Sequence, residues 1–421
     1  MKKILYLIAG FLLITSSAYS AEEIKLDTND FIPNVVATTN STTSTNNEQI
    51  QLQTGTSQIV PLEETVIQNP ETLNHHYRFY DELARTAHDV YNLKIENTNV
   101  PACLLKKPLT HEFEHGPLES IHTWGVIQMN NTTTIPEYGG GNDKFSVGLI
   151  NAIIDGKFRG GKEDFRIMFD PTPQHKRGFT HQLIQDLYIE THRIPNNVIM
   201  FGNSRVGGGI EGTQSPYTLP FMNRSQISRN LGNIRKFGIR VKGNYALMDY
   251  DFGGYSSDTF LSEFFPGVEF NGMVNFKPLG LTDGRYGKLR TGGGIVTGQH
   301  HSRDYFVATA YLGYEYKKFW TRMEYANSDG SNGGDGLTSK KRQGWYVTLG
   351  YHINKKWEVL ARYDEFDPDK TICANNKREY TFGVNYYIKG QALKLLLNYV
   401  YCQNENKPDS HRIIVGTQIA I

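Results

Sequence analysis

Hydrophobic and polar residues alternate along most of the chain beyond residue 119. The segment REYTFGVNYYI (378–388) places aromatic and aliphatic side chains at every second position, with mainly polar or small residues between them. QALKLLLNYVYC (391–402) and GWYVTLGYHI (344–353) repeat this scheme. A period of two is the pattern of a β-strand whose two faces meet different surroundings. The pattern therefore predicts many β-strands between residues 119 and 421.

Sixteen segments of this kind can be counted. Polar turns as short as KGQ (389–391) and NKK (354–356) alternate with longer stretches rich in Gly, Asp and Asn, at 328–341, 367–377 and 403–411. Strands of about ten residues joined in this way are typical of bacterial outer-membrane barrels, which favour an even strand number. Sixteen strands leave a water-filled channel, whereas about eight would be filled by side chains. The predicted strands lie near 121–129, 144–155, 163–170, 181–193, 196–206, 234–242, 245–254, 268–278, 288–298, 303–316, 318–328, 343–353, 356–366, 378–388, 391–402 and 411–421.

The two faces of these strands differ in a way that favours a membrane barrel over a soluble β-sandwich, which is the alternative. One face is apolar with Tyr and Trp near strand ends, as in the aromatic girdles of outer-membrane barrels. The other face carries charges, which suit a water-filled lumen better than a packed core. The aromatic positions are Trp345, Trp357, Tyr363, Tyr380, Tyr386, Tyr399 and Tyr401, and the charged ones are Arg322, Glu324, Glu358, Arg362 and Lys394. We predict an all-β fold, a transmembrane antiparallel β-barrel over 119–421.

The first 118 residues lack this pattern and are predicted to form three segments. Residues 1–20 contain two lysines, an apolar run and a small-residue end, which is the pattern of a secretory signal peptide. An uncleaved anchor helix is the alternative, but the apolar run is too short to span a membrane. Residues 21–66 read as a polar low-complexity linker. Residues 67–118 read as a periplasmic helical arm, with an amphipathic helix near 70–93. The chain is therefore expected in the bacterial outer membrane.

Composition narrows the expected partners. The chain has 44 Lys and Arg against 43 Asp and Glu, a net charge of +1, so no basic surface for nucleic acid is expected. Outer-membrane lipid and small solutes are the expected partners, the N-terminal arm is free to contact an envelope component, and no cofactor is expected. Three cysteines leave at least one thiol unpaired. Cys373 and Cys402 lie near the same ends of two neighbouring predicted strands, so a bridge is possible, and Cys103 would then be free.

The stretch LTHEFEHGP (109–117) contains His111, Glu112 and His115 at the spacing H-E-x-x-H. On a helix this spacing presents two zinc ligands and a general base. Pro108 and the Gly-Pro pair after His115 leave room for about two turns of helix at most. Few apolar residues are present to bury such a helix, and no third ligand follows at the required spacing. We interpret the match as adventitious and predict no metal site here.

The stretch 186–231 contains three short elements in a fixed order. A strand ends in Gly202 with Arg205, then IEGTQS (210–215) supplies a Glu element, and FMNRS (221–225) supplies a Phe-x-x-Arg element. With similar segments at 123–130, 357–367 and 380–401, these elements resemble the phosphate-selective porin O and P family of bacterial outer membranes. The resemblance covers about 300 residues. It implies a porin barrel, passive passage of small anions such as phosphate, and a homotrimer.

The chain departs from the family pattern at three places. VGGG (206–209) stands where the family has Pro-Phe-Gly, and Asn223 stands where it has an acidic residue. The chain ends in Ile421, whereas outer-membrane barrels commonly end in an aromatic residue. Apolar residues still alternate through 413–421, so the implied fold stands. Phosphate selectivity is not carried over, and phosphate remains one candidate among small anions.

Residues 207–233 are too long for a hairpin turn, and the resemblance implies a loop that folds inward and narrows the pore. The next segment, RKFGIRVKG (235–243), alternates cations with apolar residues, so a ladder of three cations is expected to face the lumen. Cations at a constriction favour anions. The predicted constriction residues are Arg205, Arg224, Arg229, Lys236, Arg240 and Lys242, with Glu211 predicted to pin the loop.

Several alternatives stay open. Arg224 could serve only to pair with Glu211, and the acids at Asp249, Asp251, Glu269 and Glu324 could cancel the field of the ladder. A barrel enzyme would need clustered catalytic groups at strand ends. The histidines of the barrel fall at no catalytic spacing with a Ser or a paired Asp: they are His122, His181, His192, His300, His301, His352 and His411. We therefore expect no enzyme. A structural or adhesive outer-membrane protein that uses its N-terminal arm is the other alternative.

Overall fold

The computed structural model describes residues 110–172, 183–206, 208–232, 234–258, 263, 265–282 and 284–420. The predicted signal peptide, the polar linker, the helix near 70–93 and Cys103 lie outside the described residues. Within the described part, no helix has both the length and the apolar character needed to cross a membrane.

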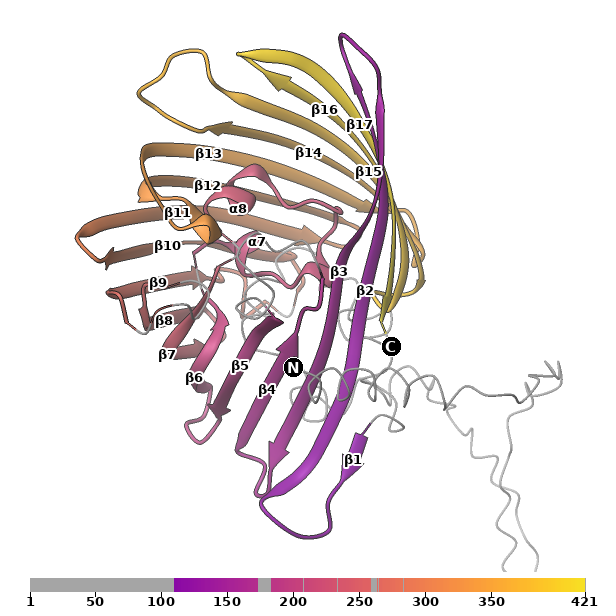
Figure 1. The fold of residues 1–421 in the computed structure, drawn as a ribbon. Helices are drawn as coiled ribbons and strands as arrows, with labels where there is room; N and C mark the ends of the chain where they lie inside the picture. Colours follow the sequence, from indigo (N-terminus) through magenta and orange to yellow (C-terminus); the bar gives the residue numbers. More distant parts are fainter. Residues whose placement is uncertain are drawn as a thin grey trace, which may run out of the picture. The chain divides into compact units, whose positions relative to one another are not determined.

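Among the described residues, sixteen antiparallel strands form one closed barrel (Figure 1). Consecutive strands pair along the chain, and the last strand pairs with β2 through Ser410–Ala420 and Val126–Pro136, which closes the ring. Each predicted strand overlaps one observed strand, so the predicted fold class and strand number are confirmed. The strands are β2 (Leu118–Pro136), β3 (Asn142–Phe158), β4 (Glu163–Phe169), β5 (Ile184–Thr191), β6 (Asn197–Arg205), β7 (Arg235–Asn244), β8 (Met248–Ser256), β9 (Val268–Phe276), β10 (Lys288–His300), β11 (Arg303–Tyr316), β12 (Phe319–Ser331), β13 (Leu337–His352), β14 (Trp357–Asp367), β15 (Lys377–Lys389), β16 (Leu393–Asn404) and β17 (Lys407–Ala420).

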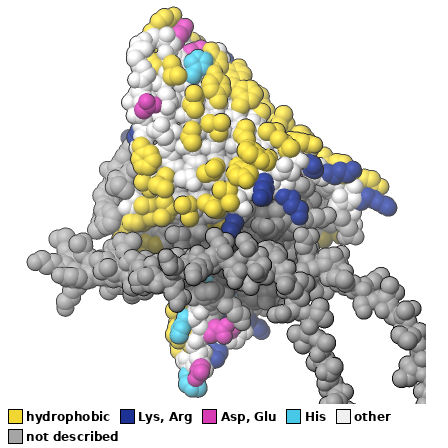
Figure 2. Space-filling view, turned by 90° about the vertical axis from the view of Figure 1, so that its right-hand side faces the viewer, with side chains coloured by type: hydrophobic (Ala, Val, Ile, Leu, Met, Phe, Trp, Pro, Cys, Tyr) yellow, Lys and Arg dark blue, Asp and Glu magenta, His cyan; other side chains and the backbone are white. Residues whose placement is uncertain are grey.

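The alternation of side chains sorts the barrel wall into two faces. Phe382, Leu397 and Val415 are 58%, 49% and 55% exposed and point outward. Asn385 and Lys394, on the opposite faces of β15 and β16, are fully buried inside the barrel. Figure 2 shows hydrophobic side chains spread over one outer face. An apolar exterior and a charged interior are the arrangement that a barrel needs in lipid, and the predicted assignment of the two faces is confirmed.

One predicted long loop is wrong. Residues 403–411 were expected to form an irregular connection, but β16 extends to Asn404 and β17 begins at Lys407. Asn404 pairs with Lys407, so only a tight turn remains. Polar strand ends can continue the ladder beyond the apolar band because backbone hydrogen bonds form regardless of side-chain polarity. Sequence polarity alone therefore placed the loop boundary too early.

Two further expectations concern the Cys373–Cys402 bridge and the stretch 109–117. Cys373 is an exposed free thiol, whereas Cys402 is a buried free thiol, so the possible bridge between them is absent. Cys402 is buried in β16, with its Sγ accepting a hydrogen bond from Arg412 Nε at 3.1 Å. His111 and Glu112 lie in the short strand β1 (Thr110–Glu112), paired with β2. Neighbouring residues of a strand point to opposite sides, so these two side chains do not share a face there.

Candidate pore constriction

The connection between β6 and β7 (206–234) turns into the barrel. It contains three short helical turns, α7 (Ile210–Thr213), η3 (Pro216–Thr218) and α8 (Gln226–Asn230), and α7 and α8 lie within the curve of the sheet in Figure 1. Most of its described residues are buried, several are partly buried, and Arg229 is exposed. Turns this short have little stability of their own, so their position depends on contacts with the barrel wall.

The first anchor of this loop is Glu324 on β12. Its carboxylate accepts hydrogen bonds from the backbone N–H groups of Ile210 at 2.9 Å and Glu211 at 3.3 Å. Gly209 precedes these groups with φ +143°, and a Cβ at this position would overlap Glu324 Oε1. Only glycine adopts this conformation readily while letting a carboxylate approach the backbone. Gly209 therefore lets the loop start against the wall.

Glu211 is the second anchor and is buried inside the barrel. Its carboxylate lies 3.5 Å from Arg322 Nη2 and 3.4 Å from Arg362 Nη1. It also accepts a hydrogen bond from the backbone N–H of Ser225 at 2.6 Å. Burial alone would raise the pKa of Glu211, but the charges of Arg362 and Arg322 hold it below its ordinary value. Glu211 therefore ties both limbs of the loop to β12 and β14.

Arg224 also fixes the loop, but not through a carboxylate. Its guanidinium donates to the backbone carbonyls of Glu211 and Gln214, the latter at 2.6 Å. Burial lowers the pKa of Arg224 to about 10, while nearby Glu211 opposes the shift, so the group is still charged at neutral pH. The alternative of a simple Arg224–Glu211 ion pair is thus replaced by carbonyl contacts that close the loop on itself.

The middle of the loop contacts strands β15 and β16 of the wall. Lys394 Nζ donates to the carbonyls of Tyr217 and Leu219 at 3.2 and 3.0 Å. Phe221 is 2% exposed, and the guanidinium of Arg362 lies 4.8 Å from its ring centroid. A Cβ on Gly383 of β15 would come within 2.8 Å of the Phe221 ring. A glycine in the wall therefore makes room for the largest apolar side chain of the loop.

The predicted cationic ladder does face inward, and acids lie beside it. Lys236 Nζ is 2.8 Å from Glu269 Oε2, and Arg240 Nε donates to Asp251 Oδ1 at 2.6 Å. Lys242 lies opposite Asp251 in the β7–β8 register and is fully buried. The remaining predicted cation before the loop is buried too: the guanidinium of Arg205 lies 3.5 Å from the carbonyl of Gly212. The ladder is thus part of a mixed-charge wall.

A different set of cations shares one acid. Arg229 Nη2 lies 2.7 Å from Glu379 Oε2, and Arg412 Nη2 lies 2.6 Å from Glu379 Oε1. Two guanidinium groups on one carboxylate leave one positive charge in excess. A pocket of about 250 Å³ adjoins them. It is lined by Gln226, Lys377, Arg378, Glu379, Cys402, Asn404, Ser410 and Arg412.

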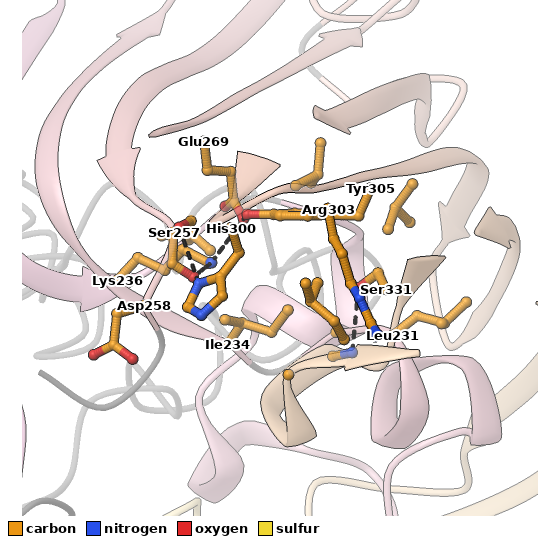
Figure 3. Close-up of a pocket in the computed structure, with 18 of the residues that line it drawn as sticks. Leu231, Ile234, Lys236, Ser257, Asp258, Glu269, His300, Arg303, Tyr305 and Ser331 are labelled. Atoms are coloured by element: carbon orange, nitrogen blue, oxygen red, sulfur yellow. Dashed lines mark hydrogen bonds and ion pairs between the residues drawn. The ribbon is translucent and has the colours of Figure 1, made fainter. Parts of the chain in front are cut away.

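A second pocket, of about 460 Å³, lies beside the base of the loop (Figure 3). Lys236, Glu269 and Tyr305 form one network in its wall: Tyr305 Oη donates to Glu269 at 2.5 Å, and Lys236 Nζ donates to the Ser257 carbonyl at 2.8 Å. His300 and Arg303 line the same pocket as Asp258 and Glu263. Both signs of charge are present, so this pocket suits polar solutes without favouring one sign.

The wall residues that hold the loop were not among the predicted constriction residues. Arg322, Glu324, Arg362 and Lys394 were assigned to the lumen face from their period-two position, and that assignment is correct. Their hydrogen bonds and ion pairs with the loop could not be predicted from the sequence, because these residues lie more than one hundred positions from Glu211 along the chain. No sequence pattern marks Arg412, whose Nη2 donates to Glu379 Oε1 on β15 at 2.6 Å.

Comparisons with known proteins agree with this architecture. Residues 282–419 match the family described as phosphate-selective porin O and P. That range includes the similar late segments 357–367 and 380–401 and excludes the stretch 186–231. A curated uncharacterized protein of Aquifex aeolicus (strain VF5) is 29% identical over 85 residues, which is 19% of this chain and 20% of that protein. The chain therefore spans about a fifth of the length of this relative.

Solved structures resemble the barrel more widely. The outer membrane channel DcaP of Acinetobacter baumannii is 11% identical, with a TM-score of 0.54 over 74% of this chain and 99% of that one. An anion-selective porin from Comamonas acidovorans is 12% identical, with a TM-score of 0.53 over 72% and 99%. At such identities the similarity shows the fold alone. The described strands have the fold of outer-membrane porins, the C-terminal part of the chain matches the phosphate-selective porin O and P family, and together they support an outer-membrane porin channel.

Proposed function

We propose that this protein is an outer-membrane porin through which small hydrophilic solutes diffuse passively, with a preference for anions. The closed barrel with an apolar exterior and a charged interior supports a channel in lipid. The loop 206–234 divides the interior, so passage follows the space between this loop and the remaining wall. Selection in such a channel depends on its width and on the charges along it.

The observation that carries the preference for anions is the sharing of Glu379 by Arg229 and Arg412. Arg229 is an exposed residue of a mostly buried loop, so its charge acts on the open space. Lys377 lines the same pocket. The ladder Lys236, Arg240 and Lys242 contributes less, because acids lie beside it. Arg224 bonds to carbonyls, which satisfy its hydrogen-bond donors without neutralising its charge.

Phosphate and chloride are both within the range of anions that such a field admits, and phosphate is a solute to test. We also propose export by the signal peptide at 1–20 and assembly as a homotrimer, which the family resemblance implies. A contact between the arm at 67–118 and another envelope component is part of the same proposal.

The test of selectivity is the reversal potential of the purified protein in planar bilayers with asymmetric KCl. We expect a reversal potential whose sign indicates that chloride is more permeant than potassium. In the double variant Arg229→Ala with Arg412→Ala, this potential should move towards zero. Arg224 is left unchanged because its replacement would release the loop and alter width and charge together. The matched control is Lys341→Ala. The Lys341 side chain is 61% exposed and pairs with Asp329.

The control variant should keep the wild-type reversal potential. A cation-side reversal potential in the unmodified protein would contradict the anion preference, as would an unchanged potential in the double variant. Adding phosphate to one chamber then tests whether phosphate competes with chloride for passage.

A further inference from the structure

Three metal-ligating side chains converge at the end of the barrel opposite the mouth from which the loop 206–234 enters. Asp164 is the second residue of β4, Glu190 lies at the end of β5, and His192 follows β5 directly. His192 Nε2 is 3.3 Å from Asp164 Oδ2 and 3.6 Å from Glu190 Oε1. One ligand atom from each of the three residues lies within 4.8 Å of the other two. The cluster offers one imidazole nitrogen and two carboxylates to a shared point.

The backbone brings these groups together. Asp164 and Glu190 are direct partners in the antiparallel β4–β5 register, so their side chains share the inner face. Glu190 and His192 are two positions apart, which keeps them on one side of the chain. The His192 N–H donates to the Lys162 carbonyl at 2.7 Å, which continues the ladder past the strand end. The three groups are therefore positioned by main-chain hydrogen bonds.

The charges at this point favour a cation. Two carboxylates directly opposite each other in a sheet repel, and both are buried here, at 5% and 4% exposure. His192 completes the cluster as the one ligand without a negative charge, so a divalent cation here would balance the charges of the two acids.

Geometry agrees with a metal ion. Zinc lies about 2.0 to 2.2 Å from imidazole nitrogen and carboxylate oxygen, so two ligand atoms at a tetrahedral centre are about 3.4 Å apart. The observed separations of 3.3 and 3.6 Å bracket this value. The His192 side chain is 35% exposed, which gives an ion access from solvent.

We propose that Asp164, Glu190 and His192 bind one divalent transition-metal cation of the Zn²⁺ type, with water completing its coordination. His192 would donate the lone pair of Nε2 to the metal, and Asp164 and Glu190 would each supply a carboxylate oxygen. Because imidazole is a better ligand for Zn²⁺ than for Mg²⁺, the site should discriminate between these ions. This inference goes beyond the proposed channel and does not depend on its selectivity.

The test is calorimetric titration of ZnCl₂ into the EDTA-treated, detergent-extracted full chain. We expect about one Zn²⁺ per chain and no comparable binding of MgCl₂. His192→Gln and Asp164→Asn should each weaken binding at least about tenfold. The matched control is His301→Gln, because Glu263, His300 and His301 form the other such cluster among the described residues.

Equal Zn²⁺ affinity in the wild type and both variants would overturn the proposal, and so would loss of binding in His301→Gln alone. Folding of each variant is checked by heat-dependent migration in gels. If neither variant folds, the unmodified protein still decides the matter. Absence of Zn²⁺ binding by the unmodified protein, or equal binding of Zn²⁺ and Mg²⁺, would then contradict the proposal.

Discussion

Replacing Glu211 by Gln should release the loop 206–234 from the barrel wall. The substitution keeps the shape of the side chain and an oxygen that can accept from the Ser225 N–H, but it removes the charge that faces Arg322 and Arg362. Each of these pairs, near 3.4 Å, has a Coulomb energy of about 5 kcal/mol at an effective dielectric constant of about 20. Removing one partner of a buried ion pair costs about 3 to 5 kcal/mol net, because the remaining charges stay buried.

A loss of about 3 kcal/mol in loop anchoring raises the population of the undocked loop by about 150-fold. Two assays report this change. Trypsin should cut Glu211→Gln after Arg224 and Arg229 at concentrations that leave the wild type intact, and single-channel records should show added current noise. The control is Asp329→Asn, which removes the acid of an exposed pair with Lys341. Wild-type protease resistance together with wild-type noise in Glu211→Gln would refute the anchoring role.

Other predictions test the same loop and its wall. Acidification should lower the anchoring of the wild-type loop: the pKa of Glu211 is held below 4.5, so its stabilisation is present above that pH and is lost as pH falls through the lower folded value. The Glu211-dependent rise in single-channel noise should therefore occur in strongly acidic buffer, and Glu211→Gln should lack it. Gly383→Val should displace Phe221 and destabilise the docked loop by about 1 to 3 kcal/mol. The variant should then be cut by protease where the wild type is not. An unchanged digestion pattern would mean that the barrel wall adjusts to the larger side chain. Gly209→Ala places a Cβ against Glu324 at positive φ. The midpoint temperature at which the loop 206–234 leaves the barrel wall, measured by near-ultraviolet circular dichroism, should fall by several degrees. A midpoint equal to wild type would mean that the start of the loop is not constrained as described.

The barrel could be predicted from sequence because its signal is local. Alternation along each strand is set by the two environments on either side of the wall. The pattern can therefore be recognised within the roughly ten residues of a single strand. The same reasoning assigned Arg322, Arg362 and Lys394 to the interior. Strand ends were less predictable, because main-chain pairing at Asn404 and Lys407 continues past the apolar band.

The constriction was predictable only in outline. The length of 207–233 and the family resemblance indicated an inward loop, but the anchors of Glu211 depend on which distant strands come to lie beside it. Charge balance on the ladder depends on register, since the acid beside Arg240 comes from the neighbouring strand. The possible Cys373–Cys402 bridge failed for a similar reason: proximity of strand ends does not bring two thiols together, and Cys402 is buried beside Arg412 instead.

A porin channel narrowed by a docked loop is tested most directly by single-channel conductance of the purified wild-type protein in planar bilayers. We expect discrete, uniform current steps from protein that migrates differently in gels before and after boiling, and no steps from the boiled sample. Absence of steps from the folded protein, under conditions where it inserts into the bilayer, would contradict the proposed channel.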